Sequence, residues 1–339
     1  MVLRLLALSP LAFVFACAAS QPPAPPPQAS ATPVEPPPAP VVAAPAAPGP
    51  ITVDVFTAPD EASAVNSYLV QNDRELIVVD GQMVVPAAQG LVEKIKATKK
   101  APKAFFLTHA HPDHYFGFHA LQQAFPGAPV YATAGVKAEF DGAAKGTLEP
   151  MKGMLGAAAP TDIAKVTLLE GALELGGEKL EVIELNGGEH SVSAIVRIPS
   201  IKAVLAGDHL YASVRNWMKV CDGKTWIGHL EEWKKGDAAT TYYPGHGAAR
   251  GGADLLDANI ACIQGFEAEV AKAKGKDEAA LVADAMKLAL AKFPTHRAPQ
   301  FLDWTMADYL KCSRPAKGGK AAAPAKSAAP VKLAARAKK

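Results

Sequence analysis

The stretch Thr108-His109-Ala110-His111-Pro112-Asp113-His114 places four metal-ligand side chains within six residues. It directly follows the apolar run 104–107, which predicts a buried strand. On an extended segment, residues two apart project to the same side, so His109 and His111 can reach one ion. The Asp and His that follow lie where the chain turns into a helix and can face a second ion. Because imidazole and carboxylate suit zinc, the stretch predicts a metal site.

Six residues cannot encircle two ions, so further ligands must come from elsewhere in the chain. Three candidates lie beside glycines, where the backbone can turn sharply and bring a side chain inward. They are His190 in Gly-Gly-Glu-His-Ser, Asp208 in Ala-Gly-Asp-His and His246 in Pro-Gly-His-Gly. Each is weak evidence alone, but the set in this order is strong.

The pattern HxHxDH, a distant His, Gly-Asp and Pro-Gly-His-Gly resembles the metallo-β-lactamase superfamily from about Val53 to Gly247. The resemblance implies an α/β fold, the four-layer αββα sandwich, with a dinuclear metal site at one edge. Helices beyond residue 251 would form a C-terminal extension. Carried over by position, the first ion would be bound by His109, His111 and His190, the second by Asp113, His114 and His246, and Asp208 would bridge both. Asp80 would orient the histidine loop.

Two positions depart from the best-known members. Glu189 stands where many relatives have glycine, and it could crowd or polarise the first metal. Asp208 occupies the position where the best-known zinc β-lactamases have cysteine. That difference favours the glyoxalase II, lactonase and phosphodiesterase side of the superfamily, and β-lactamase activity stays an open alternative.

Such a site predicts a dinuclear metallo-hydrolase that uses a hydroxide bridged by two zinc ions. Two dications, two carboxylates (Asp113 and Asp208) and one hydroxide leave a small positive charge, which lowers the pKa of bound water. The expected reaction is cleavage of an ester, thioester, lactone or amide-type bond. Tyr211 resembles a tyrosine of acyl-homoserine lactonases and could donate to the developing oxyanion. Ordinary packing is the alternative for Tyr211.

Two other kinds of function remain open: a mononuclear iron sulfur dioxygenase and a metal-binding protein without turnover. The intact second ligand set speaks against the dioxygenase. The N/O ligands would accept Mn or Fe as well as Zn. The expected partner is a small-molecule substrate. Nothing predicts a specific nucleic-acid partner, and the sequence leaves the oligomeric state open.

Aromatic residues between Asp208 and His246 should overhang the site. Trp217 or Trp226 is expected to touch substrate, whereas Trp233 is explained equally well by core packing. His209 is expected to neighbour the site without binding metal. Surface or core roles are expected for the remaining histidines of the globular region, His119, His229 and His296.

The flanks differ from the globular region in composition. Residues 1–20 have the positive start and short apolar core of a signal peptide, with a lipobox-like end at Cys17. Residues 21–50 contain 13 Pro and 8 Ala, which indicates an extended tether. Residues 313–339 carry eight Lys or Arg and no acid, which predicts a disordered basic tail. We therefore expect a periplasmic or outer-membrane-anchored lipoprotein attached through Cys17, or a secreted protein.

The remaining 262 residues of the 339 divide into a catalytic domain, 51–250, and a helical extension, 251–312. A net charge of +2 excludes a polyelectrolyte, and four cysteines are too few for a disulfide scaffold. In an oxidising compartment we expect one pair, Cys262 with Cys312, and three free thiols are the alternative. Strands are predicted over 51–56, 64–70, 75–80, 104–107, 163–169, 179–185, 193–198 and 203–205, and helices over 86–99, 253–274, 278–292 and 299–311.

Overall fold

The computed structural model describes residues 47–248 and 250–314. The described residues form one compact unit. The predicted signal peptide with Cys17, most of the tether and nearly all of the basic tail lie outside the described residues. Within the described part, no helix combines the length and apolarity needed to cross a bilayer.

The first sheet has six strands in sequence order. Its first three strands are antiparallel neighbours, and the pairs from β3 to β6 are parallel. The run Leu76–Val79 is fully buried, as expected for a strand covered on both faces. The strands are β1 (Thr52–Thr57), β2 (Asn66–Gln71), β3 (Leu76–Val79), β4 (Ala104–Phe106), β5 (Val130–Ala132) and β6 (Val166–Leu168).

The second sheet has five strands in the order β11-β10-β9-β8-β7. Only β10 and β11 are parallel; the other neighbours are antiparallel. The strands are β7 (Leu173–Leu175), β8 (Glu178–Asn186), β9 (Val192–Ile198), β10 (Ala203–Ala212) and β11 (Thr241–Gly247). β10 is longer than the predicted strand 203–205, so Asp208 lies within a strand.

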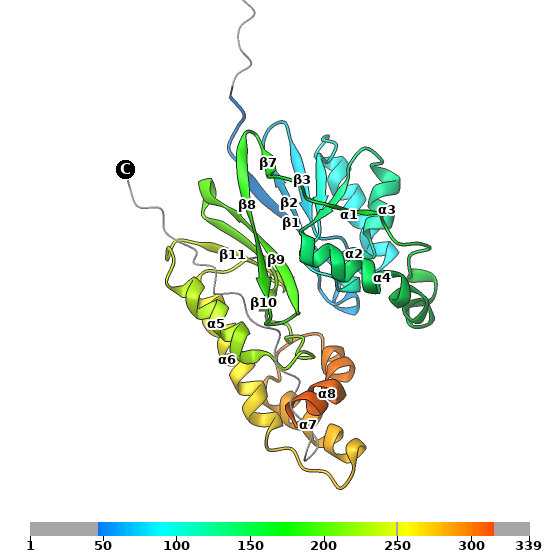
Figure 1. The fold of residues 1–339 in the computed structure, drawn as a ribbon, viewed down its shortest axis with the longest axis vertical. Helices are drawn as coiled ribbons and strands as arrows, with labels where there is room; N and C mark the ends of the chain where they lie inside the picture. Colours follow the sequence, from blue (N-terminus) through cyan, green and yellow to red (C-terminus); the bar gives the residue numbers. More distant parts are fainter. Residues whose placement is uncertain (1–46, 249, 315–339) are drawn as a thin grey trace, which may run out of the picture. The chain divides into compact units, whose positions relative to one another are not determined.

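Helices cover the outer faces of both sheets (Figure 1). Beside the first sheet lie α1 (Val85–Ala97), α3 (Phe118–Ala124) and α4 (Ala134–Leu155). In α1, Leu91 and Ile95 lie one turn apart and are fully buried in the same core cluster as β3 and β4. The second sheet is covered by α5 (Gly223–Lys234) and α6 (Ala253–Val270). This arrangement is the predicted αββα sandwich.

The chain continues after α6 into α7 (Glu278–Lys292) and α8 (Gln300–Ser313). Both helices share one hydrophobic cluster with α5, α6 and β10, through side chains such as Ala285, Phe301 and Met306. The C-terminal helices are therefore built onto the sandwich rather than set apart from it.

The cysteine pairing differs from the prediction. Cys312, near the end of α8, forms a disulfide with Cys221 in the loop before α5. The predicted partner Cys262 is a free, buried thiol on α6. The predicted Cys262–Cys312 bond is therefore wrong: Cys262 is buried on α6, and its thiol faces His296.

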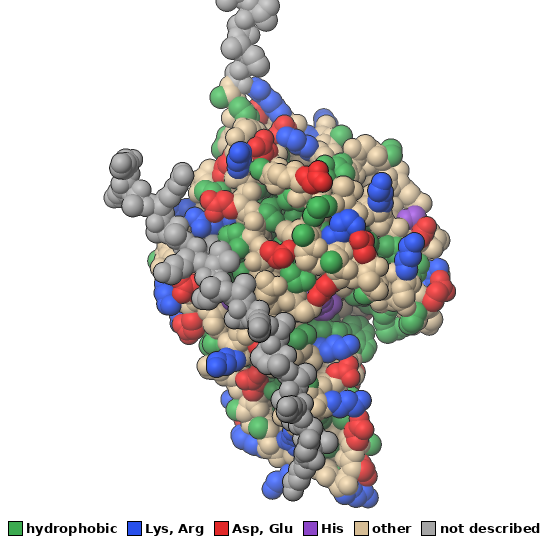
Figure 2. Space-filling view, viewed as in Figure 1, with side chains coloured by type: hydrophobic (Ala, Val, Ile, Leu, Met, Phe, Trp, Pro, Cys, Tyr) green, Lys and Arg blue, Asp and Glu red, His purple; other side chains and the backbone are tan. Residues whose placement is uncertain are grey.

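Charged side chains of both signs are interspersed over the face drawn in Figure 2, and hydrophobic side chains gather beside a hollow in which a histidine is visible. This pattern gives no large field of a single sign on that face.

Candidate metal centre

The histidine loop begins where β4 ends. Parallel pairing of β3 with β4 brings the carboxyl ends of both strands to one edge of the first sheet. His111 is extended, with φ −93° and ψ 141°, and Pro112 starts the short helix α2 (Pro112–Tyr115). Proline suits a first helical position because its missing N–H needs no partner there. Asp113 and His114 therefore lie on the first turn of α2.

The first ligand group consists of His109, His111, Glu189 and Asp208, whose ligand atoms all lie within 4.8 Å of one another. His109 Nε2 lies 3.0 Å from His111 Nδ1 and 3.6 Å from Asp208 Oδ2. Glu189 Oε1 lies 3.5 Å from His111 Nδ1. Atoms bound tetrahedrally to one zinc ion are roughly 3.4 Å apart, so these separations fit a shared ion.

The second ligand group consists of Asp113, His114 and His246. The Nε2 atoms of His114 and His246 face each other at 3.4 Å. Asp113 Oδ2 lies 3.4 Å from His246 Nε2 and 3.9 Å from His114 Nε2. These three donors, from α2 and β11, therefore also converge closely enough to share one ion.

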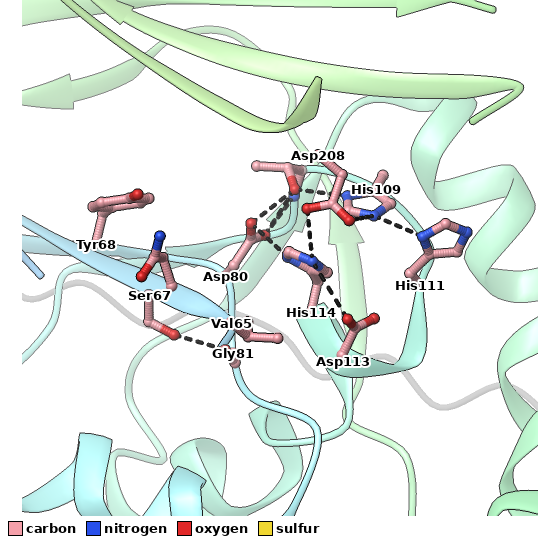
Figure 3. Close-up of polar contacts among 12 residues, drawn as sticks. Val65, Ser67, Tyr68, Asp80, Gly81, His109, His111, Asp113, His114 and Asp208 are labelled. Atoms are coloured by element: carbon pink, nitrogen blue, oxygen red, sulfur yellow. Dashed lines mark hydrogen bonds and ion pairs between the residues drawn. The ribbon is translucent and has the colours of Figure 1, made fainter. Parts of the chain in front are cut away.

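Asp208 lies between the two groups (Figure 3). Its Oδ1 is 3.1 Å from His114 Nε2, and its Oδ2 is 3.1 Å from His246 Nε2. Only 3% of its side chain is exposed, and its two oxygens face imidazole nitrogens of both groups. A buried carboxylate is costly unless cations or hydrogen-bond donors face it. This position is the one that the sequence analysis assigned to the bridging ligand.

Asp80 contacts His114, a member of the second ligand group (Figure 3). It follows β3 in a left-handed conformation, with φ 62°, which aspartate tolerates better than most residues. Its carboxylate accepts hydrogen bonds from the backbone N and the hydroxyl of Thr108 and lies 2.9 Å from His114 Nδ1. When Nδ1–H donates to Asp80, Nε2 is left with its lone pair toward the site.

His246 is held by contacts from the loop that precedes β2 and from the first residue of β2. Its Nδ1 lies 2.7 Å from the carbonyl oxygen of Ser63, which again leaves Nε2 free. Asn66 Nδ2 donates to the carbonyl of Pro244 at 2.8 Å and so holds the part of β11 that carries His246. A Cβ on Gly245 would lie 1.9 Å from Asp208 Oδ1, so only glycine lets β11 approach β10 this closely.

Tyr211 lies on β10 beside the ligands. Its hydroxyl donates to Asp208 Oδ2 at 2.8 Å, and its ring stacks on His246 at 5.1 Å between centroids. The hydroxyl therefore orients the shared carboxylate. In this arrangement its proton is directed at Asp208 rather than at the cavity.

The positions of His190 and Glu189 differ from those expected in the sequence analysis. His190 belongs to neither ligand group. Its Nδ1 contacts the Val192 carbonyl oxygen at 3.1 Å and Glu139 Oε2 of α4 at 2.9 Å. The His190 ring still lies beside that of His111, at 4.5 Å between centroids, and the adjacent Glu189 points inward as well. Sequence reasoning had noted Glu189 as a departure from the family pattern but had not expected it among the ligand atoms.

Burial and charge set opposite pKa shifts in the two groups. Burial lowers the pKa of His109 and His111, which favours their neutral, metal-binding form. Burial also opposes the charge on His114 and His246, but the carboxylates, above all Asp208, outweigh it and raise both pKa values. For Asp208, burial is outweighed by His114, His246 and His109, which hold its pKa well below its usual range. A bound metal ion would displace the protons that the second group attracts.

A cavity of about 240 Å³ opens onto the ligands. Its wall is mostly apolar, and none of the described residues lining it is Lys or Arg. Trp217 lines it, as predicted, whereas Trp226 is buried and donates its indole N–H to the His209 carbonyl. Apart from Trp217 and the site residues already named, the sequence analysis missed this wall, because most of its sulfur and aromatic side chains lie in helices and resemble core residues. The lining residues are Met83, His111, Pro112, Asp113, Met151, Met154, Asp208, Tyr211, Trp217, Phe301 and Trp304.

The other histidines lie outside the ligand groups, in the structural roles expected. His209 is buried and contacts His229 at 3.2 Å, and His119 contacts Gln123 near the surface. His296 stacks on Phe293. Trp233 is a core residue that stacks on Tyr242.

Two groups of imidazole and carboxylate donors, each with its ligand atoms within 4.8 Å of one another, and a buried carboxylate that faces both groups fit a pair of divalent cations. Together with two packed sheets and outer helices, they define an αββα metalloprotein with its centre at one sheet edge. The family model described as the metallo-beta-lactamase superfamily matches residues 60–255, which is more than half of the 339-residue chain. The chain belongs to the metallo-β-lactamase superfamily.

Solved structures show the same fold. A metallo-β-lactamase family protein from Thermus thermophilus is 22% identical with a TM-score of 0.54, covering 77% of this chain and 93% of that one. A β-lactamase domain protein from Burkholderia ambifaria is 15% identical with a TM-score of 0.52, covering 75% and 85%. No curated protein matches the sequence significantly. At these identities, the likeness concerns the fold alone.

Proposed function

We propose that this protein is a dinuclear metallo-hydrolase that cleaves an uncharged, largely apolar ester, thioester or lactone. The observation that carries the proposal is the position of the two ligand groups, which share Asp208 at the base of an apolar cavity. Bound there, zinc or a similar divalent ion would act as a Lewis acid and lower the pKa of water to near neutrality.

The chain's own residues perform four tasks in this proposal. His109, His111, His114 and His246 supply neutral nitrogen donors, and Asp80 and the Ser63 carbonyl fix the tautomers of the last two. Asp113 and Asp208 supply the charge that balances the cations. Tyr211 holds the Asp208 carboxylate in place. The apolar wall excludes water from the acyl group, which strengthens the electrostatic interactions inside the cavity.

The cavity wall argues for the substrate class. Its 240 Å³ lie just below the roughly 300–1,000 Å³ typical of pockets for drug-sized ligands, so the bound portion is small. Among the described residues that line it, no Lys or Arg is present to pair with a phosphate or a carboxylate. A phosphodiester or a β-lactam carries such an anion, whereas a neutral lactone or ester does not. The wall therefore favours the neutral substrates.

The test compares substrates that differ in charge. We expect the zinc-loaded protein to hydrolyse a neutral aryl ester or lactone with a higher kcat/KM than nitrocefin or bis(p-nitrophenyl) phosphate. Asp208→Ala should lower that kcat/KM by more than about 100-fold, since losing only an outer partner of a ligand already has a 10–100-fold effect. Asp54→Ala, which changes an exposed carboxylate paired with Lys94, is the matched control and should leave kcat/KM unchanged. A preference for either anionic substrate, or full activity in Asp208→Ala, would contradict the proposal.

We further propose that the enzyme acts outside the cytoplasm, anchored to a membrane through a lipidated Cys17 and held away from it by the Pro/Ala-rich tether. The Cys221–Cys312 disulfide supports export, because disulfides persist in oxidising compartments. In cell fractionation, wild type should partition with membranes and Cys17→Ala should be soluble. Equal partitioning of the two would count against lipidation.

A further inference from the structure

Two segments far apart in the sequence lie side by side along the apolar cavity. One is the loop 213–222 between β10 and α5, and the other is 297–312, which contains most of α8. At one end, Val214 pairs with Arg297 as an isolated parallel bridge, closed by backbone hydrogen bonds of 3.1 and 3.2 Å. At the other end, the disulfide joins Cys221 to Cys312. We call these two joined segments the clasp.

The clasp carries the aromatic part of the cavity wall, namely Trp217, Phe301 and Trp304. The Trp217 ring packs on the rings of Phe301 and Trp304, at 5.6 and 6.2 Å between centroids. Trp217 also lies 5.5 Å from the ring of His111. Phe301 lies 5.3 Å from the ring of His246. The wall therefore extends from the metal ligands outward to Trp304, whose side chain is 37% exposed.

The two halves of the loop are held in different ways. Up to residue 216, side-chain hydrogen bonds hold it to α6 and α7. Beyond Trp217, an ion pair of 3.3 Å between Lys219 and Asp308 joins the loop to α8, but both side chains are about half exposed and solvent screens the pair. The covalent bond from Cys221 to Cys312 is therefore the strongest tie between this half and α8. Because Trp217 lies where the halves meet, its position against α8 depends on this bond.

We propose that Trp304 is a specificity-determining residue that contacts the apolar part of the substrate, and that Cys221 and Cys312 are positioning residues whose bond holds Trp217 beside it. The indole rings offer a large apolar surface with few rotatable bonds, so an alkyl or aryl group gains contact area at a low entropic cost. The ligand class is a neutral ester or lactone with a bulky alkyl or aryl group. The inference rests on the proposed function for its substrate, but an apolar ligand can bind this wall without being hydrolysed.

The role of the disulfide can be separated from simple stabilisation. Without the bond, the second half of the loop can leave α8 while the rest of the protein stays folded, because weakly held loops open locally. A ligand then binds only the molecules in which the clasp is closed, and its apparent dissociation constant rises by the inverse of that fraction. The complex that forms is unchanged, so KM rises while kcat is kept. A bond that only stabilised the fold would change neither value in fully folded protein.

The experiment measures ligand affinity and turnover in zinc-loaded wild type and variants. Fluorescence titration with the neutral dye Nile red gives a Kd, and hydrolysis of a neutral aryl ester gives KM and kcat. Cys221→Ser combined with Cys312→Ser should raise Kd and KM about 3–10-fold, as expected if the clasp is closed in roughly 10–30% of molecules, and keep kcat within about 2-fold. Trp304→Ala should raise Kd and KM by about 10-fold or more, and the conservative variant Trp304→Phe should stay within about 3-fold of wild type.

Ile95→Ala is the control for lost stability. Ile95 is fully buried on α1 in the other hydrophobic cluster, and its truncation should destabilise the protein to an extent similar to loss of the disulfide. Circular dichroism identifies a temperature at which wild type and the variants are folded. At that temperature Ile95→Ala should keep the wild-type Kd and KM.

Three results would overturn the inference. They are wild-type dye affinity in the double serine variant, wild-type dye affinity in Trp304→Ala, and a loss of affinity in Ile95→Ala as large as in the double serine variant. Because Trp304 is partly exposed, its variants test the wall even if the double serine variant does not fold. If wild type binds the dye but hydrolyses no neutral ester, the proposed function fails, and the dye affinities still decide the role of the clasp.

Discussion

The loops that carry the ligands and the helices that wall the cavity are built in different ways. The ligand loops bury charged and polar side chains, and nearly all of these groups have a named partner, such as Asp80 for His114 or the Ser63 carbonyl for His246. The C-terminal helices bury apolar side chains, and α8 is joined to the rest by the Cys221–Cys312 disulfide. Metal binding and substrate choice can therefore vary separately. Substitutions in the loops should change metal affinity, and substitutions in the helices should change stability and the shape of the pocket.

Removing the disulfide gives the largest expected effect on stability. The bond closes a loop with a sequence separation of 91 residues, so Cys221→Ser combined with Cys312→Ser should lower the free energy of unfolding by about 2–4 kcal/mol. Chemical denaturation checks the value. Zinc stoichiometry should not change, because neither cysteine belongs to a ligand group. Loss of a zinc ion in this variant would break the proposed separation of the two regions.

Asp80→Asn tests the loop side of the comparison. An amide has a single acceptor oxygen, whereas the His114 Nδ1–H and the backbone N–H of Thr108 bond different oxygens of Asp80. The variant cannot accept from both, so the imidazole loses its fixed tautomer. We expect zinc affinity at the second group to fall by about 10–100-fold. The matched control is Asp60→Asn, which changes an exposed carboxylate paired with Arg297. Equal zinc affinity in Asp80→Asn and wild type would show that the site does not depend on this support.

Titration of the buried Cys262 thiol has the smallest expected effect on stability, and this effect is confined to alkaline pH. Burial raises the pKa of Cys262 from 9.0 to about 11. The native thiol should therefore react slowly with iodoacetamide at pH 8, and the urea-unfolded chain should react much faster. Because the pKa is raised on folding, the associated stability is fully present below pH 9.0 and is lost as the pH rises through about 11. Fast labelling of the native protein at pH 8 would contradict the packing described for α6.

The sequence predicted the fold class and most strands, because the apolar runs and the ligand pattern are local signals. It did not predict α4, whose 22 residues contain Pro150 and several glycines that weaken the helical pattern. It also cut β10 short, since Asp208 and His209 interrupt an apolar run although both are buried. A local sequence pattern does not predict an element where tertiary contacts override the secondary-structure propensity of its residues.

In the candidate site, too, the sequence predicted the features with a local signal and missed those that depend on tertiary contacts. Six of the seven predicted ligands, all except His190, lie in the two ligand groups. The inward position of Glu189 depends on a left-handed turn at Gly187 and Gly188, which residue types alone do not predict. The disulfide partner of Cys312 and the wall residues Phe301 and Trp304 likewise depend on how α8 packs.

The central claim is that two ligand groups sharing Asp208 hold two metal ions, and counting the ions tests it most directly. Metal-free protein is dialysed to equilibrium against buffered zinc, and bound zinc per chain is measured by elemental analysis. We predict two zinc ions per chain for wild type and a loss of tight binding at both groups in Asp208→Ala. Saturation at a single ion in wild type, or two tightly bound ions in Asp208→Ala, would contradict the account.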